Sequence, residues 1–159
     1  MFRVLNASNR APMFRGTAES VALIVGVPVA DVEGVKGEHC FRQDGEDGLI
    51  VARTIPRVLI ESPLAGDVGK NLDYALKALE DSLSRGEAPF ASHLLYPQVL
   101  DDLDPVQREQ GMAAGFAWGD CADFVAVYQD RGISPGMLRG IERHLAAGIR
   151  VDFRTLGYK

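Results

Sequence analysis

The sequence predicts an α/β fold: a doubly wound, Rossmann-like parallel sheet of about five strands with helices on both faces, plus a small N-terminal α/β appendage. From residue 57 onward, short runs rich in β-branched residues alternate with longer amphipathic stretches that have clear ends. Strands separated by helices of this length are joined by right-handed crossovers, which make a sheet parallel and cover both of its faces. We therefore expect two domains, residues 1–56 and residues 57–159.

The first crossover is predicted from three consecutive segments. The run RVLIE (57–61) is rich in β-branched residues and is followed by the loop SPLAGD, as expected of a buried strand that ends at a loop. Residues 69–86 place five apolar side chains on one helical face and end at Gly86, a typical helix terminator. A second extended piece is predicted around residues 88–94.

The next helix and strand have equally clear signals. Asp104 and Pro105 form an N-cap and first-turn pair, which predicts a helix from this point to about Trp118, closed by Gly119. The run FVAVY (124–128) is the clearest strand in the chain, because all five residues favour extended structure or burial.

Both ends of the last predicted helix have clear sequence signals. Ser134 is a good N-cap, Pro135 suits the first helical position, and Gly148 ends the helix before a closing strand at residues 149–153. Gly140 lies inside this helix, where glycine costs about 1 kcal/mol against alanine. We expect the position to face a ligand pocket.

Residues 1–56 are less informative. Residues 16–35 resemble two short helices broken at Gly26 and Pro28, and residues 48–55 resemble a strand. A DNA-binding helix-turn-helix is one interpretation of the helix pair, but nearby carboxylates would repel phosphates. These carboxylates are Asp31, Glu33 and Glu38. A packing appendage or an oligomer contact is the better interpretation.

Composition limits the classes of function. The chain has 159 residues, of which 47% are hydrophobic, enough for one domain with a real core and an appendage. A formal net charge of −5 argues against a polymeric nucleic acid as partner, although a local basic face remains possible. The sequence contains neither a membrane-length apolar run nor a signal-peptide pattern, so we expect a cytoplasmic protein with no membrane partner. Cys40 and Cys121 lie far apart without CxxC spacing, which argues against a zinc site and a disulfide framework.

Two loops at predicted carboxyl ends of strands have features of a ligand site, because ligands bind such sheets at this edge. The loop at 62–67 contains Gly66, so several backbone N–H groups can point outward together, as they do in phosphate and sugar sites. The loop has neither a Walker lysine nor a GxGxxG pattern. The alternative is that it only connects the strand to the next helix. In the loop at 129–136, the Ser134 hydroxyl can bond the first helical amides or an incoming phosphate.

The remaining candidates are single side chains. His93 lies at the end of a predicted strand, although a lone histidine is more often structural. Tyr96 either stacks on a base or covers the sheet. Several carboxylates were weighed for catalysis, and Asp130 is the one of them that lies in a predicted ligand loop, so it is our candidate catalytic residue; the others are Asp101, Asp102, Asp120, Asp123 and Glu142. The candidate substrate-binding residues are Ser62, Pro63, Gly66, Asp67, Asn71, His93, Tyr96, Ser134 and Gly136.

Taken in order, these motifs are familiar. The series ESPLAGD with Asn71 and Tyr74, APFASHLLYPQVLDD, REQGMAAGFAW, and CADFVAVYQDRGISPGM with AAGIRV resembles the nucleoside 2-deoxyribosyltransferase-like superfamily, most of all its often phage-borne members of unknown function. The resemblance covers residues 57–153 and does not extend to the first 56 residues.

The resemblance implies a pocket for a nucleoside or a nucleoside monophosphate, and cleavage or transfer at the N-glycosidic bond without a metal or organic cofactor. In the family, a glutamate attacks the anomeric carbon or stabilises the oxocarbenium ion, and an aspartate handles the proton on the leaving base. Members that hydrolyse nucleoside 5′-monophosphates hold the phosphate with a serine, matched here by Ser134, and with the first loop, matched by residues 62–66. Family members commonly form dimers or larger rings, which implies a homo-oligomer.

The catalytic acids are where this sequence departs from the family. The family's glutamate stands four residues after the glycine matched by Gly136, which is Gly140 here, and its aspartate falls at Gly115. Two hypotheses follow. In the first, a displaced carboxylate acts on the N-glycosidic bond; Asp130 is suitable if its loop folds inward, whereas Glu142 points away from the pocket. In the second, the chain is a catalytically inactive nucleotide binder, such as a sensor, sponge or regulator.

Overall fold

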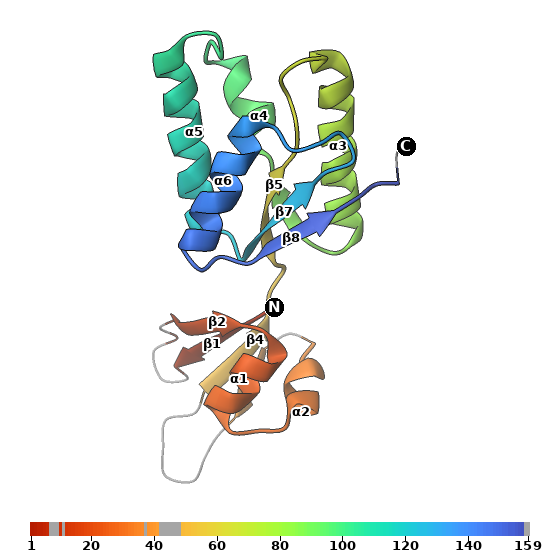
Figure 1. The fold of residues 1–159 in the computed structure, drawn as a ribbon. Coiled ribbons are helices and arrows are strands. Elements are labelled where there is room, and N and C mark those ends of the chain that lie inside the picture. Colours follow the sequence, from red (N-terminus) through yellow and green to blue (C-terminus); the bar gives the residue numbers. More distant parts are fainter. Residues whose placement is uncertain (7–9, 11, 37, 42–48, 158–159) are drawn as a thin grey trace. The chain divides into compact units, whose positions relative to one another are not determined.

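The computed structural model describes residues 1–6, 10, 12–36, 38–41 and 49–157 (Figure 1). The chain divides into two compact units, Met1–Ile55 and Pro56–Lys159. Within the described residues, no helix has both the length and the apolar character needed to cross a membrane.

The first unit is a four-stranded antiparallel sheet with two short helices. Its strand order is β2-β1-β4-β3, and the predicted helix pair and the predicted strand near residues 48–55 are confirmed. Thr17 caps α1, and Gly26 ends it with a φ of 72°, a conformation that favours glycine. The elements are β1 (Phe2–Asn6), β2 (Pro12–Gly16), α1 (Ala18–Val25), α2 (Val29–Glu33), β3 (Glu38–Phe41) and β4 (Leu49–Arg53).

A small valine-rich core holds this unit together. Val4 and Val51 from the sheet pack against Val21 of α1 and Val32 of α2, and all four are fully buried. Glu38, one of the carboxylates considered above, accepts hydrogen bonds from Arg3 and Arg10.

The second unit confirms the predicted α/β fold class, with four parallel strands where about five were expected. The strand order is β6-β5-β7-β8, so β5 and β7 are central (Figure 1). The elements are β5 (Arg57–Glu61), α3 (Val68–Ser84), β6 (Ala88–Phe90), α4 (Ser92–Leu95), the 3₁₀ helix η1 (Tyr96–Gln98), α5 (Pro105–Asp120), β7 (Phe124–Tyr128), α6 (Pro135–Ala146) and β8 (Val151–Arg154).

Helices cover both faces of this sheet. Val58 and Ile60 of β5 point to the face covered by α3, where they pack with Tyr74 and Ala78. Leu59, between them, points to the opposite face and packs with Ile141 of α6. Figure 1 shows α5 beside α6 on this second face. A strand buried on both sides explains why RVLIE has no polar residue among its three central positions.

Two sequence expectations about element ends were wrong. The extended piece predicted at residues 88–94 stops at Phe90, because the edge strand β6 pairs only with β5 and the chain then turns into α4. Gly119 does not end α5, which continues to Asp120. The reason is packing: a Cβ atom at Gly119 would lie 1.8 Å from Nε2 of His144, so glycine serves the contact between α5 and α6 rather than a helix end.

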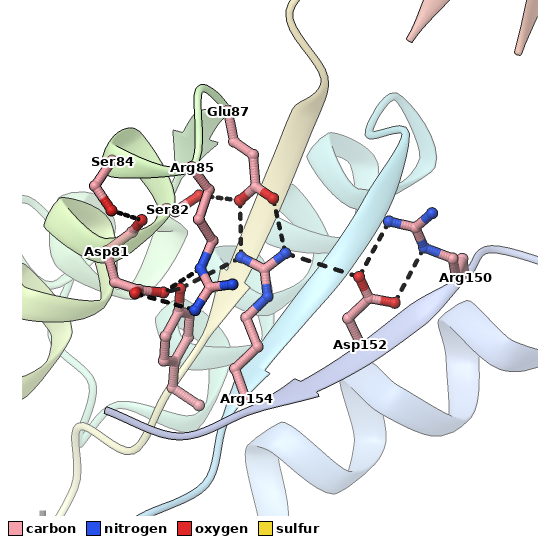
Figure 2. A network of polar contacts seen from close by, with 9 residues as sticks. Asp81, Ser82, Ser84, Arg85, Glu87, Arg150, Asp152 and Arg154 are labelled. Atoms are coloured by element: carbon pink, nitrogen blue, oxygen red, sulfur yellow. Dashed lines mark hydrogen bonds and ion pairs between the residues drawn. The ribbon is translucent and has the colours of Figure 1, made fainter. Parts of the chain in front are cut away.

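A network of largely buried polar side chains links β8 to the segment after α3 (Figure 2). Arg154 donates to both carboxylate oxygens of Glu87, at 2.7 and 2.8 Å, and the two side chains are only 11% and 10% exposed. Ser82 also donates to Glu87, at 2.7 Å. Burial opposes ionisation of Glu87, but these donors more than offset it and hold the pKa of the carboxyl below its ordinary value. The network joins α3, the start of β6 and β8.

Substitution of Arg154 tests this network. Arg154→Ala leaves the Glu87 carboxylate buried without its counter-charge, and we expect the free energy of unfolding to fall by about 3–5 kcal/mol. Trp118 is the chain's one tryptophan and lies in this unit, so its fluorescence during urea unfolding at pH 7 reports the loss. Arg139→Ala, which removes an exposed pair with Glu109, is the control and should cost at most about 1 kcal/mol. Equal losses for the two variants would contradict this description.

Candidate functional site

The carboxyl edge of the parallel sheet carries a pocket. It lies beyond the end of β5, between the loop after β5, the α4–η1 segment, α5 and the first turn of α6. The lining residues are Glu61, Ser62, Leu64, Ala65, Ser92, His93, Tyr96, Pro97, Leu100, Asp102, Gln107, Arg108, Gly111, Met112, Gly115, Phe116, Ser134, Gly136 and Met137. The lining combines an apolar wall with a few converging polar groups, which is typical of sites for small organic ligands.

Glu61 is the most unusual group in the pocket. It is the last residue of β5, and burial raises the pKa of its carboxyl to about 7. Its carboxylate makes no hydrogen bond or ion pair with any residue that the structure describes. A largely enclosed carboxyl with a raised pKa, facing a cavity, is suited to acid–base or nucleophilic chemistry. Sequence reasoning missed Glu61; the available signal was an acidic residue closing an otherwise apolar central strand.

Gly140 and Gly115, the positions where the resemblance led us to expect acids, both border occupied space. A Cβ atom at Gly140 would lie 2.9 Å from Oε1 of Glu61 and 3.7 Å from Cε1 of Phe116. A Cβ atom at Gly115 would lie 2.8 Å from Oγ of Ser92. Both glycines are buried in their helices. Polar groups from β5 and α4 therefore fill the space into which side chains at positions 140 and 115 would project.

Ser62 and His93 form a hydrogen-bonded pair in the pocket, as their side chains lie 2.8 Å apart at Oγ and Nε2. Ser62 is buried, and burial lowers the pKa of His93 to about 4. The imidazole is therefore neutral at pH 7, and one of its nitrogens can donate while the other accepts. In the tautomer that donates from Nε2, the Ser62 hydroxyl hydrogen remains available for a ligand.

The first turn of α6 forms the opposite side of the pocket. Ser134 caps this helix, and its Oγ accepts from the backbone N–H of Met137 at 3.3 Å. Gly136 follows, and a Cβ atom there would lie 3.6 Å from Nη2 of Arg108, which pairs with Asp102. A guanidinium group and a helix N-terminus thus face the same part of the cavity, where both favour an anion. Ser62 and Ser134 line one pocket, as the candidate site requires.

The other predicted binding residues divide between lining and loop-shaping positions. Tyr96 lines the pocket, with its hydroxyl accepting from Nε1 of Trp118 at 2.9 Å. Pro63 and Asn71 line a neighbouring hollow that shares Ser134 with the pocket. The Asn71 amide donates to the carbonyls of residues 64 and 65 and so shapes the loop. Asp67 caps α3.

Gly66 lines neither hollow, and its φ of 92° explains the glycine at that turn.

Asp130 does not occupy the place expected of a catalytic residue. It is not among the residues that line the pocket, although Ser134 and Gly136 of the same loop are. Its carboxylate accepts from the Tyr74 hydroxyl at 2.6 Å and from the backbone N–H groups of Leu156 and Gly157 at 2.9 and 3.1 Å. Although burial opposes its charge, these bonds hold the pKa of Asp130 below its ordinary value. The Asp130 carboxylate thus links the segment after β8 to α3.

The described residues contain no group of three His, Cys, Asp or Glu side chains placed to hold a metal ion.

Both the fold and the sequence match known proteins. A family model described as "Domain of unknown function (DUF7768)" matches residues 56–154. The fold is similar to the solved 2-deoxyribosyltransferase of the psychrotolerant bacterium Bacillus psychrosaccharolyticus, with a TM-score of 0.53 and 14% identity, covering 65% of this chain and 75% of that chain. This similarity supports a distant fold relationship of the kind the motifs predicted. No curated protein matches the chain.

The pH dependence of stability tests the state of Glu61. Its folded pKa of about 7 lies above an unfolded value of about 4.3, so ionisation destabilises the fold increasingly between these two pH values and fully above pH 7. We expect Glu61→Gln to be more stable than the original chain at pH 8.5, by on the order of 3 kcal/mol, and the difference to shrink toward pH 5.

Thermal unfolding at several pH values measures this difference. Glu142→Gln, at an exposed position of α6, is the control and should shift Tm by a similar small amount at every pH. A Glu61→Gln effect that is the same at pH 5 and pH 8.5 would show that the carboxylate is not enclosed.

Proposed function

This chain belongs to the DUF7768 family, and we propose that it binds a nucleoside 5′-monophosphate or a nucleoside in the pocket beyond β5 and acts on its N-glycosidic bond. One observation carries the proposal: two hydroxyls and a helix N-terminus converge on a pocket that also holds an enclosed carboxylate, which has no partner in the described part of the chain. Cleavage of a glycosidic bond generally needs a carboxylate close to the sugar.

The phosphate end of the ligand has suitable partners. We assign it to the side of the pocket formed by Ser62, Ser134 and the first turn of α6, with the Arg108 guanidinium nearby. Backbone N–H groups at a helix N-terminus bind a single phosphate without a net positive protein charge, so the overall charge of −5 is no obstacle. The apolar wall of Tyr96, Met112 and Phe116 then suits the flat face of a base.

Fold similarity supports the substrate class. The similar solved structure is a 2-deoxyribosyltransferase described as a biocatalyst for nucleoside synthesis. In proteins with open α/β sheets, ligands bind at the carboxyl ends of the strands, and the pocket occupies this place. Function follows from the site rather than from the fold, so the pocket residues determine which reaction can take place.

An active enzyme is a better interpretation than an inactive binder for one physical reason. A carboxylate near the phosphate of a bound nucleotide weakens binding by charge repulsion. Enclosing a carboxylate without a partner also costs free energy. A group of this kind is retained where it takes part in chemistry.

We also propose that the protein is a cytoplasmic homo-oligomer. Exposed apolar side chains, such as Leu23 and Ile24 of α1, offer a surface for a second copy.

Sedimentation velocity at micromolar concentration tests this assembly: we expect a dimer or larger species, and Leu23→Glu should weaken it by placing a charge in the contact. A monomer at that concentration would contradict the proposal.

Base release tests the proposed reaction. The full chain is incubated with each 2′-deoxynucleoside 5′-monophosphate and with the matching nucleosides, and free base is measured by chromatography. We expect at least one monophosphate both to raise Tm and to yield free base. A rise in Tm without release would identify an inactive binder, and neither effect would overturn the substrate class.

A charge at the helix cap tests the phosphate position. Aspartate caps helices as well as serine does, so Ser134→Asp should leave stability nearly unchanged. Its carboxylate would repel the phosphate, so we expect the affinity for monophosphates to fall about tenfold or more while nucleoside binding persists. Thr17→Asp at the cap of α1 is the matched control. Equal affinities in calorimetric titrations of both variants would place the phosphate elsewhere.

A further inference from the structure

We propose that Glu61 is the catalytic carboxylate of this site, the group that bonds to the anomeric carbon of the sugar, and that Gly140 is glycine because this carboxylate needs the room. The inference rests on the proposed function, which it deepens by naming the reacting residue. Neither the motifs nor the family match assigns a role to Glu61.

The position of Glu61 suits a reacting group. β5 lies between β6 and β7 in the sheet, and the three residues directly before Glu61 are buried. The backbone of Glu61 is therefore fixed by hydrogen bonds to a neighbouring strand, through its register with Val127. A catalytic group on a rigid strand is held more accurately than one on a loop.

The missing counter-charge separates Glu61 from the structural carboxylates of the same unit. Glu87 is buried but pairs with Arg154, and Asp123, whose side chain is 6% exposed, pairs with Arg57. The Asp130 carboxylate accepts three hydrogen bonds. Glu61 has no such partner among the described residues, although it is enclosed enough for its ionisation to be strongly disfavoured. A structural role does not account for an unpaired carboxylate that faces a cavity.

Gly140 gives the second, independent observation. Alanine would stabilise the middle of α6 by about 1 kcal/mol, yet the position is glycine. Its φ is not in the left-handed region, so the backbone does not require glycine. The constraint is the Glu61 carboxylate, whose Oε1 lies 2.9 Å from where a Cβ atom would be. A methyl group there would push the flexible end of Glu61 away from its present place.

The other carboxylates considered for this role are paired or exposed. Asp102 also lines the pocket but pairs with Arg108, and Glu142 is exposed on α6. Of the carboxylates that line the pocket within the described residues, Glu61 is thus the unpaired one.

The reaction that this geometry supports has two steps. In the first, an Oε atom of the ionised Glu61 forms a bond to C1′ as the C1′–N bond breaks; the bonding electron pair stays on the base nitrogen, and the base takes a proton from water. In the second, the oxygen of a water molecule bonds to C1′, the ester bond to Glu61 breaks, and the water proton passes to solvent. The products are free base and sugar 5-phosphate, and the carboxylate is regenerated.

Three variants of the full chain test the assignment, with release of base from the monophosphate that the original chain cleaves as the readout. Glu61→Gln keeps the shape of the side chain, and we expect the rate to fall by about 10³-fold or more with nucleotide affinity retained. Gly140→Ala displaces the carboxylate without removing it, and we expect a loss of about 10–100-fold with little change in Tm. Glu142→Gln is the matched control and should keep the original rate.

The outcomes separate this inference from the proposed function. No release by the original chain overturns the proposed function and the inference together. Release by the original chain with Glu61→Gln within tenfold of it overturns the inference alone. If Glu61→Gln does not fold, Gly140→Ala decides: an unchanged rate overturns the inference, and a loss of rate with unchanged nucleotide affinity supports it.

Discussion

The carboxylate of Glu61 and the helix α6 compete for the same space, and this competition shapes the pocket. The carboxylate closes a central strand and has no counter-charge among the residues that the structure describes, so its burial raises its pKa. It fits because α6 has no side chain at the facing position, Gly140. Glycine at this position makes α6 locally less stable than alanine would, but it leaves room for the Glu61 carboxylate in the pocket lining.

The two faces of the sheet in the second unit differ in how they are packed. The face under α3 is closed by Tyr74, Ala78 and the network around Arg154 and Glu87 (Figure 2). The face under α5 and α6 is apolar near Ile141 and opens into the pocket at the carboxyl edge. The buried Glu87 carboxylate is therefore paired on one face, while the Glu61 carboxylate lies where a ligand can reach it.

Periodicity and helix caps were sufficient to predict most of this fold. Every strand and long helix of residues 57–159 was located, because strands buried on both faces and helices with Asp104 or Ser134 at their caps have strong local signals. Glycines were ambiguous, since Gly119 was taken for a helix end but makes room for His144. Three strands of the first unit were not predicted, because short antiparallel strands depend on pairing with distant residues.

Contacts between distant residues were also what the sequence did not reveal in the pocket. Sequence order indicated which loops meet at the carboxyl edge, so Ser62, His93, Tyr96, Ser134 and Gly136 all line the pocket. It did not indicate that Asp130 turns toward Tyr74, or that a strand residue fills the space beside a helix glycine. Such contacts join residues far apart in the chain, and one sequence carries no local signal for them.

A crystal structure of the Glu61→Gln variant with a bound deoxynucleoside 5′-monophosphate tests the central claim most directly. We predict that C1′ of the sugar lies within about 3–3.5 Å of a side-chain atom of residue 61, with the phosphate at the first turn of α6. A nucleotide bound with its anomeric carbon far from residue 61, or bound outside the pocket, would contradict it.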